Sequence, residues 1–174
     1  MNRNLMLAAA AVLVAGCGGN DLRKTYAVTG TVTIDGTPAD PGVLVWLHPQ
    51  FPESDKYPIH PRGETKQGGE FKILTYNTDD GAPEGEYVAT VEWPQRSGMS
   101  THFSGDLFGG AFANLEANKS KQEFHVNVTR NGAQLNLKLT LTPQQKTAFE
   151  AAKKKAAPKK KAAKKAKQAV KRKK

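Results

Sequence analysis

The chain has 174 residues, one cysteine and a formal net charge of +10. The single cysteine excludes an internal disulfide, and the roughly 120 residues between two atypical ends suffice for one hydrophobic core but not for two. The charge is uneven, because residues 151–174 carry twelve Lys, one Arg and no acid, whereas residues 1–150 carry 13 basic and 16 acidic groups. A mildly acidic body therefore precedes a strongly cationic tail.

The N-terminus has the features of an export signal. A short positive start precedes an apolar run over residues 5–14, shorter than the roughly 20 residues that a membrane-spanning helix needs. The run ends in Val14-Ala15-Gly16-Cys17, which resembles the lipobox of bacterial lipoproteins. We expect residues 1–16 to be a signal peptide and Cys17 to be lipidated, with residues 17–24 as a tether. The alternatives are an ordinary secretory signal with an incidental cysteine and a buried N-terminal helix.

The body begins with alternating residues, which predict a strand over residues 25–34 and a tight turn at Asp35-Gly36. A second strand is expected over residues 43–48, which are apolar on both faces and therefore suit a central position. A proline-rich surface loop over residues 49–63 and a short strand over residues 64–67 follow. The residues of the first strand that we expect to face the core are Tyr26, Val28, Val32 and Ile34.

We expect the rest of the body to be organised around one hairpin. Residues 69–76 and 86–93 both alternate in β-branched and aromatic residues, and residues 77–85 between them are rich in Asp, Gly and Pro. A single hairpin is not stable alone. The other strands should therefore cover its apolar face.

Two further strands are predicted near the end of the body. Alternation marks residues 121–128 and 135–141, with a turn at Asn131-Gly132 between them, whereas residues 94–120 show no sustained period. Six or seven strands at these spacings indicate an all-β fold, an antiparallel β-sandwich of about seven strands over residues 25–141. The pattern requires no helix in the body.

Four runs of the body resemble a known family: Val28-Thr-Gly-Thr-Val-Thr-Ile-Asp-Gly36, Gly69-Glu-Phe-Lys-Ile-Leu-Thr-Tyr76, Asp80-Gly-Ala-Pro-Glu-Gly-Glu-Tyr-Val88 and Gly109-Gly-Ala-Phe-Ala-Asn114. They resemble a family of short lipoproteins abundant in planctomycetes, which are similar to the carboxypeptidase regulatory-like domain. The resemblance implies a transthyretin-like (prealbumin-like) β-sandwich over about residues 26–141, and export. It implies no reaction.

The sequence offers no motif for nucleophilic or metal-assisted catalysis, since Gly-x-Ser-x-Gly, a glycine-rich phosphate loop and His-Glu-x-x-His are all missing. Ser97, Ser100 and His102 are close in sequence, but proximity in a loop does not make a triad. Enzymes of the transthyretin-like fold that act on hydroxyisourate end in Tyr-Arg-Gly-Ser, whereas this chain ends in Lys-Arg-Lys-Lys174. We therefore expect no enzyme, no catalytic residue and no cofactor.

Two groups of side chains could in principle hold a metal ion. His48, His60 and Asp55 bracket the proline-rich loop, and we interpret them as surface residues. The acids of the second group lack the spacing of a calcium loop, and we interpret them as a solvated turn that satisfies its own backbone amides. This second group consists of Asp79, Asp80, Glu84 and Glu86.

Phe108, Phe112 and Leu115 lie in the segment without a sustained period. They could form an exposed loop that contacts a ligand, or they could plug the end of the sandwich. We favour the plug, because apolar residues under a long loop usually form satellite core.

Residues 142–174 are expected to form a short helix and a basic Lys/Ala-rich tail. Thr142 as cap, Pro143 at the first helical position and Gln145 three residues after the cap predict a helix start. The helix should run through Phe149 and break or kink at Pro158. Charge repulsion should leave the tail disordered or partly helical when it is free.

The composition of the tail is similar to that of linker-histone tails, which neutralise phosphates without reading sequence. The expected polyanion-binding residues are Lys153, Lys154, Lys155, Lys159, Lys160, Lys161, Lys164, Lys165, Lys167, Lys171, Arg172, Lys173 and Lys174. The sequence thus predicts a non-enzymatic protein that is lipid-anchored to a bacterial membrane, inner or outer, and faces the periplasm or the cell exterior. Its β-sandwich would be a structural or binding module, and its tail would contact anionic lipid or envelope polymer. The alternative is a polyanion- or nucleic-acid-binding protein that acts through the tail, which export would disfavour.

Overall fold

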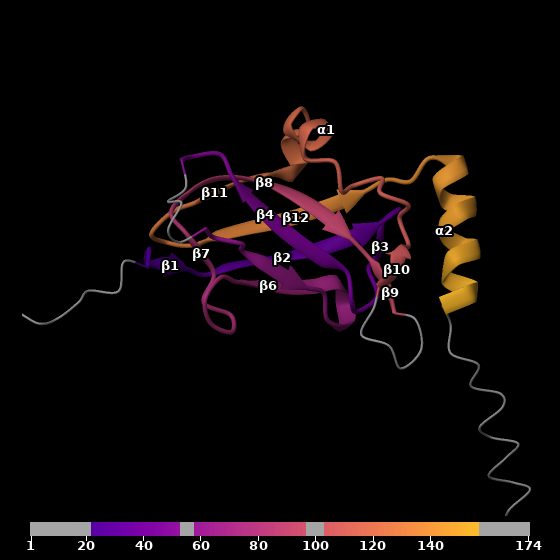
Figure 1. Ribbon diagram of the computed structural model, residues 1–174, viewed down its shortest axis with the longest axis horizontal. Coiled ribbons are helices and arrows are strands. Elements are labelled where there is room, and N and C mark those ends of the chain that lie inside the picture. Colours follow the sequence, from indigo (N-terminus) through magenta and orange to yellow (C-terminus); the bar gives the residue numbers. More distant parts are fainter. Residues whose placement is uncertain (1–21, 53–57, 97–102, 157–174) are drawn as a thin grey trace, which may run out of the picture.

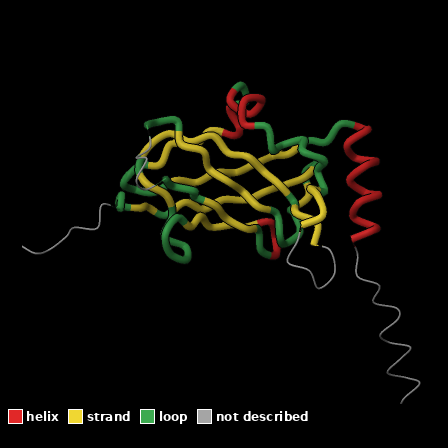
Figure 2. The backbone as a smooth tube through the Cα atoms, viewed as in Figure 1, coloured by secondary structure: helices red, strands yellow, loops and turns green. Residues whose placement is uncertain are grey.

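The computed structural model describes residues 22–52, 58–96 and 103–156 (Figure 1). Residues 1–16, Cys17 and the part of the tail beyond Ala156 lie outside the described residues, as do Asp55, Ser97, Ser100 and His102. The described chain is mostly β, with strands that form a curled body and a helix at one end of it (Figure 2).

The main sheet has the strand order β11-β8-β4-β5-β6-β2-β12, and β3 pairs with β2 beside this path. Its strands are β2 (Val28–Ile34), β3 (Thr37–Pro38), β4 (Leu44–Pro49), β5 (Arg62–Glu64), β6 (Glu70–Leu74), β8 (Gly85–Glu92), β11 (His125–Val128) and β12 (Ala133–Leu139). Two small pairs flank it: β1 (Thr25–Tyr26) with β7 (Ala82–Pro83), and β9 (Pro94–Arg96) with β10 (Phe103–Asp106).

The pairs between described strands are antiparallel except for β12 with β2, which run parallel from Ala133↔Val28 to Leu139↔Ile34. The sheet curls, so that the strands at the two ends of its order, β11 and β12, lie beside each other and are joined through the Asn131-Gly132 turn. One core fills the interior of the curl.

The predicted core positions are largely confirmed. Every second residue from Leu135 to Leu141 is buried, as are Val28 and Val32, whereas Tyr26 and Ile34 are half-buried. The central position of β4 is also confirmed, because β4 pairs with β5 on one side and with β8 on the other. The turn after β2 forms at Asp35-Gly36, where both residues have positive φ (49° and 79°).

The expected central hairpin is wrong. Both of its strands form, but β6 pairs with β5 and β2, whereas β8 pairs with β4 and β11. The connection explains this: the Asp80 carboxylate accepts hydrogen bonds from the backbone N–H groups of Thr75, Tyr76 and Asn77 at 2.7, 3.1 and 3.0 Å. The chain then pairs with β1 through β7, and so it crosses to another part of the curled sheet instead of folding back.

A tyrosine fixes the chain where it enters β8. The Tyr87 hydroxyl donates to the carbonyl oxygen of Pro83, four residues earlier, at 2.9 Å. A hydroxyl that closes a corner in this way also occurs in Greek-key β-sandwiches. The Phe51 ring packs edge-on against Tyr87, with ring centroids 5.3 Å apart, and it also covers Gly85.

The expectation that the body contains no helix is wrong as well. Asn114 caps the start of α1 (Leu115–Lys119), and its side-chain oxygen accepts the N–H of Ala117 at 3.0 Å. β11 covers β8 only as far as Val88, and the Asn118 amide then donates to the carbonyl oxygen of Ala89 at 3.0 Å. The helix thus replaces a strand at the edge of β8.

Two predicted strands are shorter or displaced, and 3₁₀ turns occupy part of the residues expected in them. η2 (Gln122–Phe124) occupies the first half of the strand that we expected over residues 121–128. η1 (Gln67–Gly69) follows β5, which lies earlier than the strand that we expected over residues 64–67.

Candidate functional site

The cationic tail leaves the body through helix α2 (Pro143–Ala156), which lies at the opposite end of the molecule from β1 and β7 (Figure 1). The predicted start of this helix is confirmed. The Gln145 side-chain oxygen accepts the N–H of Thr142 at 2.9 Å, and the Thr142 hydroxyl accepts the N–H of Gln145 at 3.3 Å. This reciprocal capping box satisfies two backbone donors at the helix start.

An aromatic cluster holds α2 against the body. The Phe149 ring stacks on Phe108, with centroids 5.6 Å apart and planes 10° from parallel, and it lies 5.6 Å from Trp93. Phe108 in turn packs edge-on against Phe112 at 5.4 Å. All three phenylalanines are at most 6% exposed. The plug hypothesis for Phe108 and Phe112 is therefore confirmed, and α2 completes the plug.

Two ion pairs flank the cluster. Lys146 Nζ lies 2.9 Å from Asp35 Oδ2, and Lys153 Nζ lies 2.7 Å from Asp40 Oδ2. The Lys153 ammonium also lies over the rings of Trp93 and Phe149, 5.6 and 5.7 Å from their centroids. Exposed pairs of this kind contribute about 0.2–1 kcal/mol each, so the aromatic contacts dominate the docking and the ion pairs fix its orientation.

Asp35 joins the β2–β3 turn to both sides of the helix start. Besides the pair with Lys146, its Oδ1 accepts the N–H of Leu141 at 3.3 Å. The hydrogen bond from Lys146, supported by that from Leu141, lowers the pKa of the Asp35 carboxyl below its ordinary value. The turn that the sequence predicted therefore also helps to orient α2 on the body.

A groove of about 410 Å³ lies between α2 and the β2–β3 turn. Its charged residues are the acids Asp35, Asp40 and Glu150 and the bases Lys146 and Lys153. Four of these five groups are paired with each other, and the groove contains no combination of nucleophile, base and hydrogen-bond donors around a common point. The charged groups of the groove therefore serve to hold α2 against the body.

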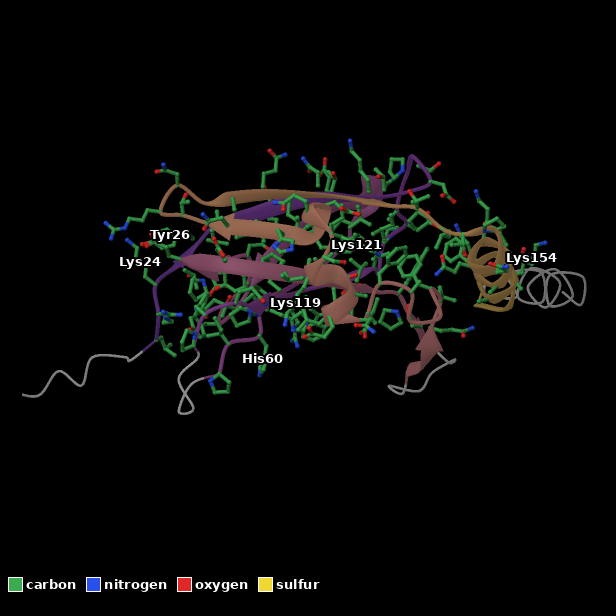
Figure 3. The ribbon with its side chains drawn as sticks, turned by 90° about the horizontal axis from the view of Figure 1, so that it is seen from above. Lys24, Tyr26, His60, Lys119, Lys121 and Lys154 are labelled. Atoms are coloured by element: carbon green, nitrogen blue, oxygen red, sulfur yellow. The ribbon has the colours of Figure 1, made fainter. Side chains whose placement is uncertain are left out.

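The structure separates the predicted tail lysines. Lys153 is bound to the body, whereas Lys154 on the same helix is exposed and points away from it (Figure 3). Lys155 lies within α2, and the other predicted cations and Cys17 lie outside the described residues. Of the two predicted tail lysines whose side chains the structure describes, Lys154 is thus the one left available to an external anion.

The other candidates take structural roles where they are described. His48 Nε2 lies 2.9 Å from the Thr90 hydroxyl, and His60 is exposed. Asp80 is occupied by backbone amides, as the turn hypothesis predicted, and Asp79 and Glu84 lie 3.6 and 3.5 Å from basic side chains. Within the described ranges, no group of three or more His, Cys, Asp or Glu side chains is arranged to hold a metal ion.

Sequence reasoning missed the residues that receive α2, namely Asp35, Asp40 and Trp93. A signal for the docking face was present, because Lys146, Phe149 and Lys153 recur at intervals of three and four residues and so share one side of a helix. Nothing in the local sequence, however, shows which part of the body that side contacts.

Comparison with known proteins gives no relative. The chain matches no family model, no curated protein and no solved structure. No helix in the part of the chain that the structure covers is long and apolar enough to span a membrane.

Proposed function

We propose that this protein is a non-enzymatic, lipid-anchored component of a bacterial cell envelope, in which a transthyretin-like β-sandwich is the structural module between two attachment points. One is the lipidated Cys17, and the other is the polycationic tail, which contacts an anionic surface of lipid or envelope polymer.

The observation that carries the proposal is the position of the two ends. The described chain starts beside β1 and finishes with α2, and Lys24 and Lys154 mark these opposite ends in Figure 3. The aromatic docking of Phe149 and the two ion pairs hold α2 in place. The body therefore keeps the start of the tail away from the start of the domain.

The two attachments differ in physical character. A lipid anchor contributes about 0.8 kcal/mol per buried methylene, and two or more chains hold a protein on a bilayer persistently. Each lysine near an anionic leaflet contributes about 1 kcal/mol, and salt weakens this attraction. The tail contact should thus be reversible by salt, while the lipid attachment should not.

The first test is the intact mass and membrane partition of the protein expressed in a bacterial host. The proposal predicts a species that starts at Cys17, is heavier by its acyl groups and is extracted only by detergent; Cys17→Ala should abolish all three properties. A soluble species that retains residues 1–16 would contradict the proposal and leave nucleic acid as the better partner for the tail.

The second test concerns the tail. A chain shortened after Ala156 keeps the docked helix but loses ten cations, and a matched full-length control replaces the same ten cations with Gln. Both should lose the salt-dependent binding to anionic polymer that the full chain shows. If either variant binds as strongly as the full chain, the tail is not the binding element.

A further inference from the structure

The end of the body opposite α2 carries several basic, aromatic and apolar side chains. We name it the N-terminal patch, and its members are Leu22, Arg23, Lys24, Tyr26, Phe51 and Arg130. Leu22 is 44% exposed, and it is the exposed large hydrophobic side chain of the described residues. Lys24 and Tyr26 stand at this end in Figure 3.

Contacts among its members fix the patch to the body. The Arg23 guanidinium lies 4.5 Å from the centroid of Phe51, and the Lys24 ammonium lies 5.4 Å from that of Tyr26. Phe51 packs on Tyr87 and Gly85, at the start of β8. The patch is therefore placed by the folded sheet, although it belongs to three separate segments of the chain.

The turn between β11 and β12 contributes the third cation. Ala133 donates its N–H to the carbonyl oxygen of Ala27 at 2.9 Å, which holds this turn beside β1. The Arg130 side chain is 81% exposed, and its Nε lies 3.5 Å from the Glu84 carboxylate. Arg23, Lys24 and Arg130 thus lie at this end with two aromatic rings and an exposed leucine, and the acids Glu84 and Glu86 lie at the nearby start of β8.

The chain length places this patch near the proposed lipid anchor. Only four residues separate Cys17 from Leu22. A fully extended chain advances at most about 3.6 Å per residue, so Leu22 can be no more than roughly 18 Å from Cys17. An acyl group on Cys17 would therefore hold this end of the body, and no other, close to the bilayer surface.

We infer that the N-terminal patch rests on the headgroup region of a bilayer that contains anionic lipid. This inference depends on the proposed lipid anchor and adds to it a defined orientation of the body. Lysine and arginine are attracted to anionic headgroups, aromatic rings favour the interface, and an exposed leucine can enter the acyl boundary. The patch combines all three kinds of side chain at the one end that the anchor holds near lipid.

The test measures which face of the lipid-anchored full chain lies against lipid. Acylation uses the thiol of Cys17, the only natural cysteine, so one introduced cysteine gives a single labelling site. Asn131→Cys places an environment-sensitive fluorophore beside Arg130. Gln67→Cys is the matched control, because Gln67 is also an exposed amide side chain in a turn. It lies on η1, which packs near Val32 and Ala39 at the far end of β2. Both proteins are incorporated into vesicles of anionic and zwitterionic lipid that carry a nitroxide quencher on the headgroup.

We expect strong quenching at position 131 and weak quenching at position 67. A triple variant should abolish this difference in quenching; it combines Arg23→Gln, Lys24→Gln and Arg130→Gln. A control variant removes the same charge from other surfaces and should preserve the difference; it combines Lys66→Gln, Lys121→Gln and Lys138→Gln. Two results would overturn this inference without affecting the proposed function. One is equal quenching at positions 131 and 67 in an acylated protein, and the other is a difference in quenching that the triple variant retains. An intact mass that shows no acyl group would overturn the proposed function as well.

Discussion

Gly81 and Gly36 share a left-handed backbone, with φ of 85° and 79°, but differ in their surroundings. A Cβ on Gly81 would overlap the carbonyl oxygen of Tyr26, whereas a Cβ on Gly36 would have no atom within 4 Å. Gly36→Ala should therefore cost only the left-handed penalty, about 1–2 kcal/mol. Gly81→Ala adds a clash with backbone that cannot move away, and it should cost about 2–5 kcal/mol. Urea unfolding of both variants checks the ranking, which equal losses would contradict.

The lowered pKa of Asp35 predicts an acid-sensitive helix contact. Because the folded carboxyl has the lower pKa, its stabilisation is complete at pH values above the unfolded pKa, about 3.9, and is lost as the pH falls through the folded pKa. Asp35→Asn keeps a side chain suited to the left-handed φ of 49° but removes the charge.

We expect Asp35→Asn to lower the melting temperature at pH 7. We also expect the melting temperature of this variant to fall less than that of the unchanged protein when the pH is lowered from 5 through the titration range of the Asp35 carboxyl. Thermal unfolding followed by circular dichroism at a series of pH values measures this. Asp79→Asn is the control, since Asp79 also has positive φ and lies near a lysine, but it does not touch α2. An unchanged pH dependence in Asp35→Asn would rule out this role.

Single residues were predictable where the signal was local. Asp35-Gly36 forms the turn that this dipeptide predicts. A tight two-residue turn requires positive φ at both of its residues, and Asp followed by Gly is a favoured pair for it. The use of Asp35 by Lys146 was not predictable, because more than a hundred residues separate the partners and only the folded sheet brings them together.

Among the secondary-structure elements, helix α2 is held to the body mainly by the packing of one side chain, Phe149. Phe149→Ala removes the ring that stacks on Phe108 and approaches Trp93. Loss of a buried phenylalanine costs on the order of 3 kcal/mol, and here the loss should fall on the docking of α2, since no strand pair is touched.

Hydrogen exchange checks this prediction. In Phe149→Ala, the amides of α2 should exchange much faster, whereas those of β4 and β8 should keep their protection. Gln144→Ala, an exposed position of the same helix, should leave both unchanged. Uniform loss of protection in β4 and β8 would show that α2 is part of the cooperative core.

At this scale, sequence patterns indicated faces well and neighbours poorly. Phe71 and Ile73 on β6 are buried between exposed neighbours, as alternation predicted, but β8 is buried on both faces, because Val88 and Thr90 are buried as well as Tyr87 and Val91. Alternation does not state which strand lies alongside, and β4 and β5 come between β6 and β8. Helix α1 was missed for a different reason, because its five residues are too few to show a helical period.

The whole molecule should behave as a rigid spacer. Spin labels at Asn131→Cys and Gln144→Cys in a Cys17→Ala background lie on the two ends of the body. We expect one narrow distance distribution that is the same at low and high salt, because stacking of Phe149 does not depend on ion pairs. Double electron–electron resonance measures it. A distribution that broadens at high salt would show that Lys146 and Lys153 alone hold the helix.

The opposite placement of the ends could not be predicted from the sequence. It follows from the pairing of β1 with β7 at one end and from the contact of α2 with Trp93 and Phe108 at the other. Both are contacts between distant segments, whereas periodicity and turn chemistry report only on neighbours within a few residues.

The parallel pairing of β12 with β2 has a consequence for the order of folding. Thr31 and Asn136, opposite each other in this pair, are 105 residues apart in the chain. Closing so long a loop is slow, and β2 lacks its parallel partner strand until residues 133–139 have been made. The main sheet can therefore be completed only after β12 has been made, so nearly the whole domain must be available before it folds.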